Sequence, residues 1–179
     1  MSWFQKKPAQ TTASDALKTA APRAPKGLKI SSLLSEQSIL FPPEGQDKTA
    51  VLEALVTQVC RLAGIADASP FLARVLEREA GISTTLDTGL SLPHARMDGI
   101  EGVLAGMAVL KKPIPDPKQS DLAIRVVFLF FSPNRPDAFS LHLQLLRGVS
   151  SLFQPSLIDQ LTAASGPAAA LELVKKLEA

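Results

Sequence analysis

The chain is poor in cysteine and histidine and has no long apolar run, and each shortage excludes a class of protein. Only one of its 179 residues is a cysteine, so an internal disulfide framework is excluded and a reducing cytoplasm is expected. The longest strongly apolar run, residues 126–131, is far too short to cross a bilayer, which predicts a soluble protein without stable membrane insertion. The two histidines, at positions 94 and 142, belong to no histidine or cysteine cluster, so no metal site is expected.

Three short motifs of known chemistry are incomplete or out of place. No Gly-x-x-x-x-Gly-Lys loop is present, so a nucleotide is not expected as a phosphoryl source. Residues 89–93 resemble a nucleophile elbow but lack its last glycine. Residues 86–91 contain the Asp-Thr-Gly signature of dimeric aspartic proteases, but those proteins are nearly all β, whereas this chain has at least four strong helical patterns. None of these chemistries is favoured.

The positive charge is concentrated at the start of the chain. Residues 1–27 hold five basic residues and one acid, a net charge of +4, so residues 28–179 carry −2 of the total of +2. This first segment has three prolines and no sustained apolar period, which predicts a disordered basic tail before a single domain over residues 28–179. Because nucleic-acid binding needs a basic folded face, no nucleic-acid partner is expected.

Helical and strand patterns alternate after residue 28. Asp47 is expected to cap a helix that ends near Gly64, and Ser69 to cap a second helix whose first residue is Pro70. The apolar stripe of the first helix is predicted at positions 51, 52, 55, 56, 59 and 62, with Cys60 in the core. Strands are predicted at residues 38–41, 90–92, 103–110 and 122–131, an exposed connection at 111–121, and further helices after 132, at 156–163 and at 167–177. This order predicts an α/β layered domain with a mixed sheet between helices.

Residues 78–96 hold the strongest candidate for a reactive site. Arg78 ends the second helix, and an apolar run from Leu90 to Leu92 stops at Pro93, which directs His94 outward. A histidine at a strand end near basic groups is a candidate nucleophile that is neutral near pH 7, although a surface histidine after a turn fits equally well. His142 lies on the apolar side of its helix. This position fits a residue that contacts a bound group, and it fits equally well a core histidine whose hydrogen bonds are satisfied.

The same stretch resembles a known family. Arg78-Glu79, Ser83-Thr84, Gly89 and Leu90-Ser91-Leu92-Pro93-His94 match, without a gap, a pattern found in enzyme IIA domains of the bacterial phosphotransferase system. The resemblance is to the fructose/mannitol type (type 2), which includes the nitrogen-regulatory enzyme IIA proteins, and it extends weakly over residues 28–179. It implies a three-layer α/β/α sandwich with a mixed β-sheet.

The resemblance also implies a function and a set of site residues. His94 would accept a phosphoryl group from an HPr-like phosphocarrier protein, and Arg78, His142, Ser83 and Thr84 would hold that group without a metal or another cofactor. The acceptor would be a IIB domain or a regulatory protein. A regulatory, nitrogen-type role is favoured because no transport domain is attached, with a sugar-specific transport subunit as the alternative.

Two residues depart from the family pattern, which usually has glycine where this chain has Thr85 and Asp87. An inward-pointing Asp87 would repel phosphate, so a IIA-like binding module that does not transfer phosphate is a further alternative. The net negative charge of residues 28–179 suits a carrier that presents a basic face.

Overall fold

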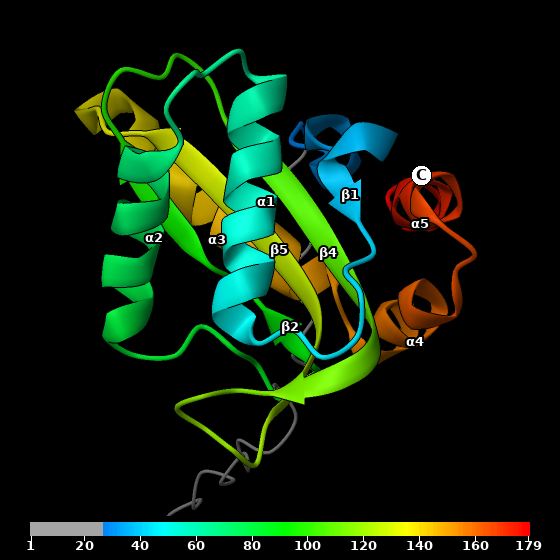
Figure 1. Ribbon diagram of the computed structural model, residues 1–179. Helices are drawn as coiled ribbons and strands as arrows, with labels where there is room; N and C mark the ends of the chain where they lie inside the picture. Colours follow the sequence, from blue (N-terminus) through cyan, green and yellow to red (C-terminus); the bar gives the residue numbers. More distant parts are fainter. Residues whose placement is uncertain (1–26) are drawn as a thin grey trace, which may run out of the picture.

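The computed structural model describes residues 27–179, so the tail predicted for residues 1–27 lies almost wholly outside the described part. The described chain folds around one five-stranded sheet (Figure 1). Its strands are β1 (Ile39–Leu40), β2 (Leu90–Ser91), β3 (His94–Met97), β4 (Leu104–Pro115) and β5 (Ala123–Pro133). Strand β4 pairs antiparallel with β5 and parallel with β1, while β2 and β3 both pair parallel with β5. The sheet is therefore mixed, as predicted.

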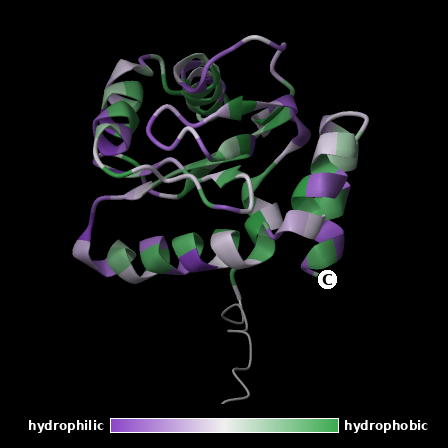
Figure 2. Ribbon diagram, turned by 90° about the horizontal axis from the view of Figure 1, so that it is seen from below, coloured by the Kyte–Doolittle hydropathy of each residue, from purple (hydrophilic) through white to green (hydrophobic). Residues whose placement is uncertain are grey.

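Helices cover both faces of the sheet, which confirms the three-layer α/β/α sandwich (Figures 1 and 2). Helices α1 (Lys48–Leu62) and α2 (Ser69–Ala80) cover one face, and α3 (Phe139–Leu152), α4 (Pro155–Ala163) and α5 (Pro167–Leu177) cover the other. Short 3₁₀ turns lie at η1 (Ile30–Leu33), η2 (Glu36–Ser38) and η3 (Pro136–Ala138). No helix in residues 27–179 is both long enough and apolar enough to span a membrane.

Strand β5 joins the two halves of the core. Its residues alternate between the faces because successive side chains of a strand point in opposite directions. Val126, Phe128 and Phe130 pack under α3, α4 and α5, whereas Val127 and Leu129 pack under α1 and α2. The prediction that this strand is buried on both faces is confirmed.

The first two helices follow their predicted signals closely, with shifts at their ends. The Asp47 side chain caps α1 by accepting a 2.8 Å hydrogen bond from the Ala50 amide, and Cys60 is buried, as predicted. Leu62 is 37% exposed, contrary to the predicted stripe, because it is the last residue of the helix. The N-cap of α2 is Ala68 rather than Ser69, so Ser69 and Pro70 are the first two helical residues.

Strand β4 continues into the segment that we predicted to be an exposed connection. It runs to Pro115, and an irregularity between Val109 and Ile114 resets its pairing with β5. A proline within a strand lacks the N–H that a ladder needs, but an irregularity of this kind tolerates it. The prolines were therefore a poor signal of where β4 ends.

Candidate active site

Three elements meet at the edge of the sheet where His94 lies. Strand β3 begins at His94, α2 ends two residues after Arg78, and α3 carries His142. A cavity of about 700 Å³ opens between them, and all three of these side chains line it. Arg74, Arg96 and Asn134, which we did not single out from the sequence, also line it. The structure therefore brings together Arg78, His94 and His142, three of the five residues that the resemblance implies.

A backbone carbonyl fixes the proton position on His94. The Nδ1 atom of the ring lies 2.7 Å from the carbonyl oxygen of Leu92. Because a carbonyl can only accept a hydrogen bond, the proton of the neutral ring lies on Nδ1, and Nε2 carries a free lone pair. The ring also stacks on Phe130, with centroids 5.5 Å apart and planes inclined by 15°. His94 is thus held in the tautomer that a nucleophile requires.

The surroundings of His94 favour its neutral form. Burial lowers the pKa of His94, and the nearby charge of Arg78 lowers it further. The Leu92 hydrogen bond and the charge of Glu79 raise the pKa, but the net shift is downward. The lone pair is therefore available at neutral pH.

His142 is a second neutral imidazole beside the first. Its side chain is 7% exposed, its ring centroid lies 5.4 Å from that of His94, and its Nδ1 atom lies 2.7 Å from the buried Oγ of Ser132. Burial lowers the pKa of His142 to about 4, helped by the charges of His94, Arg96 and Arg78. If Ser132 donates its hydroxyl proton to Nδ1, the Nε2–H of His142 is a free donor.

The low pKa of His142 should make stability pH-dependent. The His142 ring binds a proton near pH 6.5 in the unfolded chain and near pH 4 in the folded chain. The folded state therefore keeps its full stability above pH 6.5, where both rings are neutral, and loses stability as the pH falls toward 4. We expect about 3 kcal/mol of unfolding free energy to be lost in this window. In urea titrations, His142→Asn should lose correspondingly less than the wild type. Equal losses of unfolding free energy in the wild type and in His142→Asn would contradict the lowered pKa of His142.

Arg78 supplies a positive charge on the α2 side of the cavity. It lies in the last turn of α2, where the helix dipole favours a cation. Its Nη1 donates to the carbonyl of Ile82 at 3.2 Å, and no carboxylate of the described residues forms an ion pair with it. Most of its planar donor set is therefore free for an anion.

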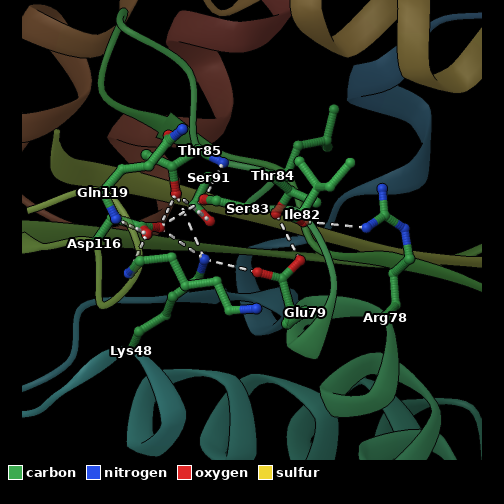
Figure 3. Close-up of polar contacts among 12 residues, drawn as sticks. Lys48, Arg78, Glu79, Ile82, Ser83, Thr84, Thr85, Ser91, Asp116 and Gln119 are labelled. Atoms are coloured by element: carbon green, nitrogen blue, oxygen red, sulfur yellow. Dashed lines mark hydrogen bonds and ion pairs between the residues drawn. The ribbon is translucent and has the colours of Figure 1, made fainter.

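Ser83 and Thr84, which were expected to complete the phosphate site, do not line the cavity. Ser83 donates to Asp116 at 2.9 Å, and Thr84 donates to Glu79 at 2.6 Å (Figure 3). Both hydroxyls are thus bound to carboxylates. Neither side chain lines the cavity, although the Thr84 carbonyl accepts a 3.0 Å hydrogen bond from the Leu92 amide, two residues before His94.

The two hydroxyls belong to a buried polar cluster centred on Lys48, the first residue of α1 (Figure 3). Its ammonium lies 2.7 Å from Oε2 of Glu79 and 3.1 Å from Oδ2 of Asp116, and the three side chains are nearly inaccessible to water. We call this the Lys48 cluster, and its members are Lys48, Glu79, Ser83, Thr84, Thr85, Ser91 and Asp116.

Hydrogen bonds keep Asp116 ionised inside the Lys48 cluster. Burial by itself would raise the pKa of Asp116, but donors from Thr85, the Lys118 amide, Lys48 and Ser83 outweigh it and hold the pKa well below its usual range. These contacts tie the loop between α2 and β2 to α1 and to the end of β4. The cluster therefore fixes the segment that connects Arg78 with His94.

The two departures from the family pattern take no part in the cavity lining. Thr85 is buried in the Lys48 cluster and donates to Asp116 at 2.5 Å. Asp87 is exposed to solvent. The repulsion expected from an inward-pointing Asp87 therefore does not arise in this structure.

The charge around His94 differs from the sequence expectation. Three arginines and one glutamate line the cavity, so its lining is positive although residues 28–179 carry −2 overall. The acid among them, Glu77, already pairs with Arg74 at 2.8 Å. A carrier with a basic face is thus a poor match for the immediate surroundings of His94.

The fold and sequence are similar to those of known proteins. A "Nitrogen regulatory protein" from Pseudomonas aeruginosa is 24% identical over 125 residues, which are 70% of this chain and 80% of that protein. The crystal structure of "Nitrogen Regulatory Protein IIA-Ntr" from Neisseria meningitidis aligns with a TM-score of 0.70 at 20% identity, over 81% of this chain and 98% of that one.

A further solved structure is a complex of mannitol enzyme IIA with phosphorylated mannitol enzyme IIB from Escherichia coli. Its matching chain aligns with a TM-score of 0.64 at 16% identity, over 80% of this chain and 97% of that one. Residues 32–177 match the family described as "Phosphoenolpyruvate-dependent sugar phosphotransferase system, EIIA 2". The chain therefore belongs to the type 2 enzyme IIA family of the phosphotransferase system.

Proposed function

We propose that the chain is a phosphohistidine carrier that accepts a phosphoryl group on Nε2 of His94 from a histidine-phosphorylated carrier protein. The observation that supports this most is the bond from Nδ1 of His94 to the Leu92 carbonyl, which leaves Nε2 as the nucleophile. His94 lines a cavity that is large enough for a phosphoryl group and has arginines in its walls. Membership of the enzyme IIA family fits the same chemistry.

The transfer step exchanges one phosphorus–nitrogen bond for another. The lone pair of Nε2 on His94 attacks the phosphorus, and the bond to the imidazole of the carrier breaks, so that its electron pair returns to the carrier. The His94 ring becomes more positive as the new bond forms. Its Nδ1–H then donates a charge-assisted hydrogen bond to the Leu92 carbonyl, which stabilises that charge.

We expect two side chains to stabilise the charge on the transferred group. Such transfer depends mainly on positioning and on donors around the three equatorial oxygens. Arg78 offers a planar fork from α2, and His142 offers its Nε2–H from α3 while Ser132 holds its Nδ1.

A protein donor fits the surface around the cavity. Ile82, which lines the cavity, is 81% exposed, and Phe139 and Leu143 on α3 are about half exposed. Exposed apolar side chains beside a functional cavity are typical of a protein docking surface. We assign them to an HPr-like phosphocarrier, with a IIB domain or a regulatory protein as the later acceptor.

A regulatory, nitrogen-type role is the physiological function we propose. Two of the similar proteins carry the name nitrogen regulatory protein. A sugar-specific role remains the second candidate, because the mannitol enzyme IIA complex has the same fold and contains phosphorylated enzyme IIB.

Reconstitution tests the phosphoryl step directly. The full chain is incubated with phosphoenolpyruvate, enzyme I and the phosphocarrier, and its intact mass is measured. The expected result is a gain of one phosphoryl group that is lost in acid and kept in base, as a phosphoramidate requires. An unchanged mass with an active phosphocarrier would leave the chain as a non-transferring binding module.

Replacing Arg78 by Lys should slow transfer by about tenfold or more, because a point charge cannot reproduce the bidentate contact of a guanidinium. The rate is measured by rapid quenching with the phosphorylated carrier. Arg61→Lys is the matched control, since Arg61 lies exposed on α1 and does not line the cavity. Equal transfer rates for Arg78→Lys and Arg61→Lys would show that Arg78 does not contribute to phosphoryl transfer.

A further inference from the structure

Arg96 is a cavity residue whose hydrogen-bonding capacity is only partly used. It follows His94 by two positions on β3, so both side chains emerge on the same side of the strand. In the register with β5, His94 is opposite Phe130 and Arg96 is opposite Ser132, the residue that binds His142. Because a strand advances by about 3.3 Å per residue, the two side chains start roughly 7 Å apart.

The guanidinium of Arg96 is anchored at one end and open at the other. Its Nη2 donates to the carbonyl of Arg135 at 2.7 Å, and its Cζ lies 5.3 Å from the ring centroid of Phe139. Its Nε is buried and has no hydrogen-bond partner among the described residues. Its Nη1 makes no hydrogen bond within the described residues and is not buried, so this atom is the donor that a ligand in the cavity can reach.

The charge balance of the cavity points to an anionic ligand. Of the three arginines in its lining, Arg74 is paired with Glu77. Arg78 and Arg96 form no ion pair within the described residues. Arg78 comes from α2, and Arg96 comes from β3 and lies beside Phe139 on α3, so two uncompensated positive charges line the cavity that holds His94. This charge matches that of a phosphoryl dianion.

We propose that Arg96 is a second phosphoryl-binding residue, which contacts the oxygens of the group on His94 from the α3 side while Arg78 contacts them from the α2 side. The inference rests on the proposed function, because it assigns a contact to the same transferred group. Arg96 would then use Nη1, which is not buried, for the phosphoryl oxygens while Nη2 stays on Arg135. A purely structural role would use only the bonds to Arg135 and Phe139.

Rapid-quench transfer from the phosphorylated carrier tests this contact. Arg96→Met keeps the length of the side chain and removes its donors, and we expect transfer to slow by about tenfold or more. The transfer rate of Arg96→Lys should lie between those of Arg96→Met and the wild type. The matched control is Arg135→Met, which removes a nearby charge from a side chain that does not line the cavity. Transfer by Arg96→Met within about twofold of the control would overturn the proposal.

A second measurement separates this inference from the proposed function. Inorganic phosphate is titrated into the full chain while the ring resonances of His94 and His142 are followed by NMR. We expect phosphate to bind the wild type and Arg135→Met alike, and Arg96→Met about tenfold more weakly. The phosphate affinities test the role of Arg96 even if the carrier fails to phosphorylate the wild type. Such a failure would refute the proposed function but not the phosphate contact of Arg96. Equal affinity in Arg96→Met, or no binding to the wild type, would refute the role of Arg96.

Discussion

His94→Gln is expected to abolish phosphoryl acceptance completely. The glutamine amide nitrogen has no free lone pair, so no phosphorus–nitrogen bond can form at the position that Nε2 of His94 occupies. The measurement is the intact mass of the variant after incubation with phosphoenolpyruvate, enzyme I and the phosphocarrier. The wild type should gain one phosphoryl group under the same conditions, and the variant none.

His142→Asn is the matched control for this loss, because it removes the other imidazole of the cavity. This variant should still become phosphorylated at His94, but more slowly, since it loses a donor and not the nucleophile. A phosphoryl group retained by His94→Gln would place the reaction on another residue. If His142→Asn alone failed to become phosphorylated, His142 would be the nucleophile and His94 the supporting donor.

Lys48→Met is expected to lower the free energy of unfolding by about 3–5 kcal/mol, because it leaves Glu79 and Asp116 as buried carboxylates without their cation. Urea unfolding of the full chain measures the loss. Lys175→Met is the matched control. Lys175 pairs with Glu172 at 2.8 Å on the surface, and such a pair contributes at most about 1 kcal/mol.

A compensated variant shows whether the loss comes from the unpaired charges. Combining Lys48→Met with Glu79→Gln and Asp116→Asn removes all three charges together. Much of the stability should return, since the cost of a broken buried pair is mainly that of the charge left behind. A loss in Lys48→Met no larger than in Lys175→Met would show that the Lys48 cluster does not stabilise the fold.

Periodicity and capping predicted most of the fold. The helix cap at Asp47, the burial of β5 on both faces and the bounds of α5 all agree with the sequence-based expectations. These features depend on local patterns in one element, which a sequence displays directly. The extension of β4 through Pro113 was not predictable, because it depends on an irregular pairing with β5.

The meeting of three candidate site residues at one cavity follows from local signals in the sequence. Arg78 ends a helix, His94 follows a strand and proline, and His142 falls on an apolar face, and these three do meet. The resemblance implied that Ser83 and Thr84 bind phosphate, but their hydroxyls donate to Asp116 and Glu79, and both of these carboxylates pair with Lys48 from a distant helix. A weak signal for that cluster was present, since Lys48 precedes Leu52 by four residues and so shares the buried side of α1.

The position of Arg96 was not predicted, because the predicted strand ended at Leu92 and β3 (His94–Met97) was not expected. An arginine two residues after a histidine on a strand points to the same side. Only the register with β5, and the packing of α3 beyond it, shows that this side faces the cavity.

The interruption between β2 and β3 at Leu92 and Pro93 has a consequence for how this protein tolerates mutation. The group that sets the tautomer of His94 is a main-chain carbonyl, so it is present whatever side chain occupies position 92. In many enzymes a carboxylate orients the reactive histidine, and one codon change removes it. Here no single side-chain replacement deletes the acceptor, and only a change in the backbone path would do so. The orientation of the His94 ring by this contact therefore does not depend on the identity of any one side chain.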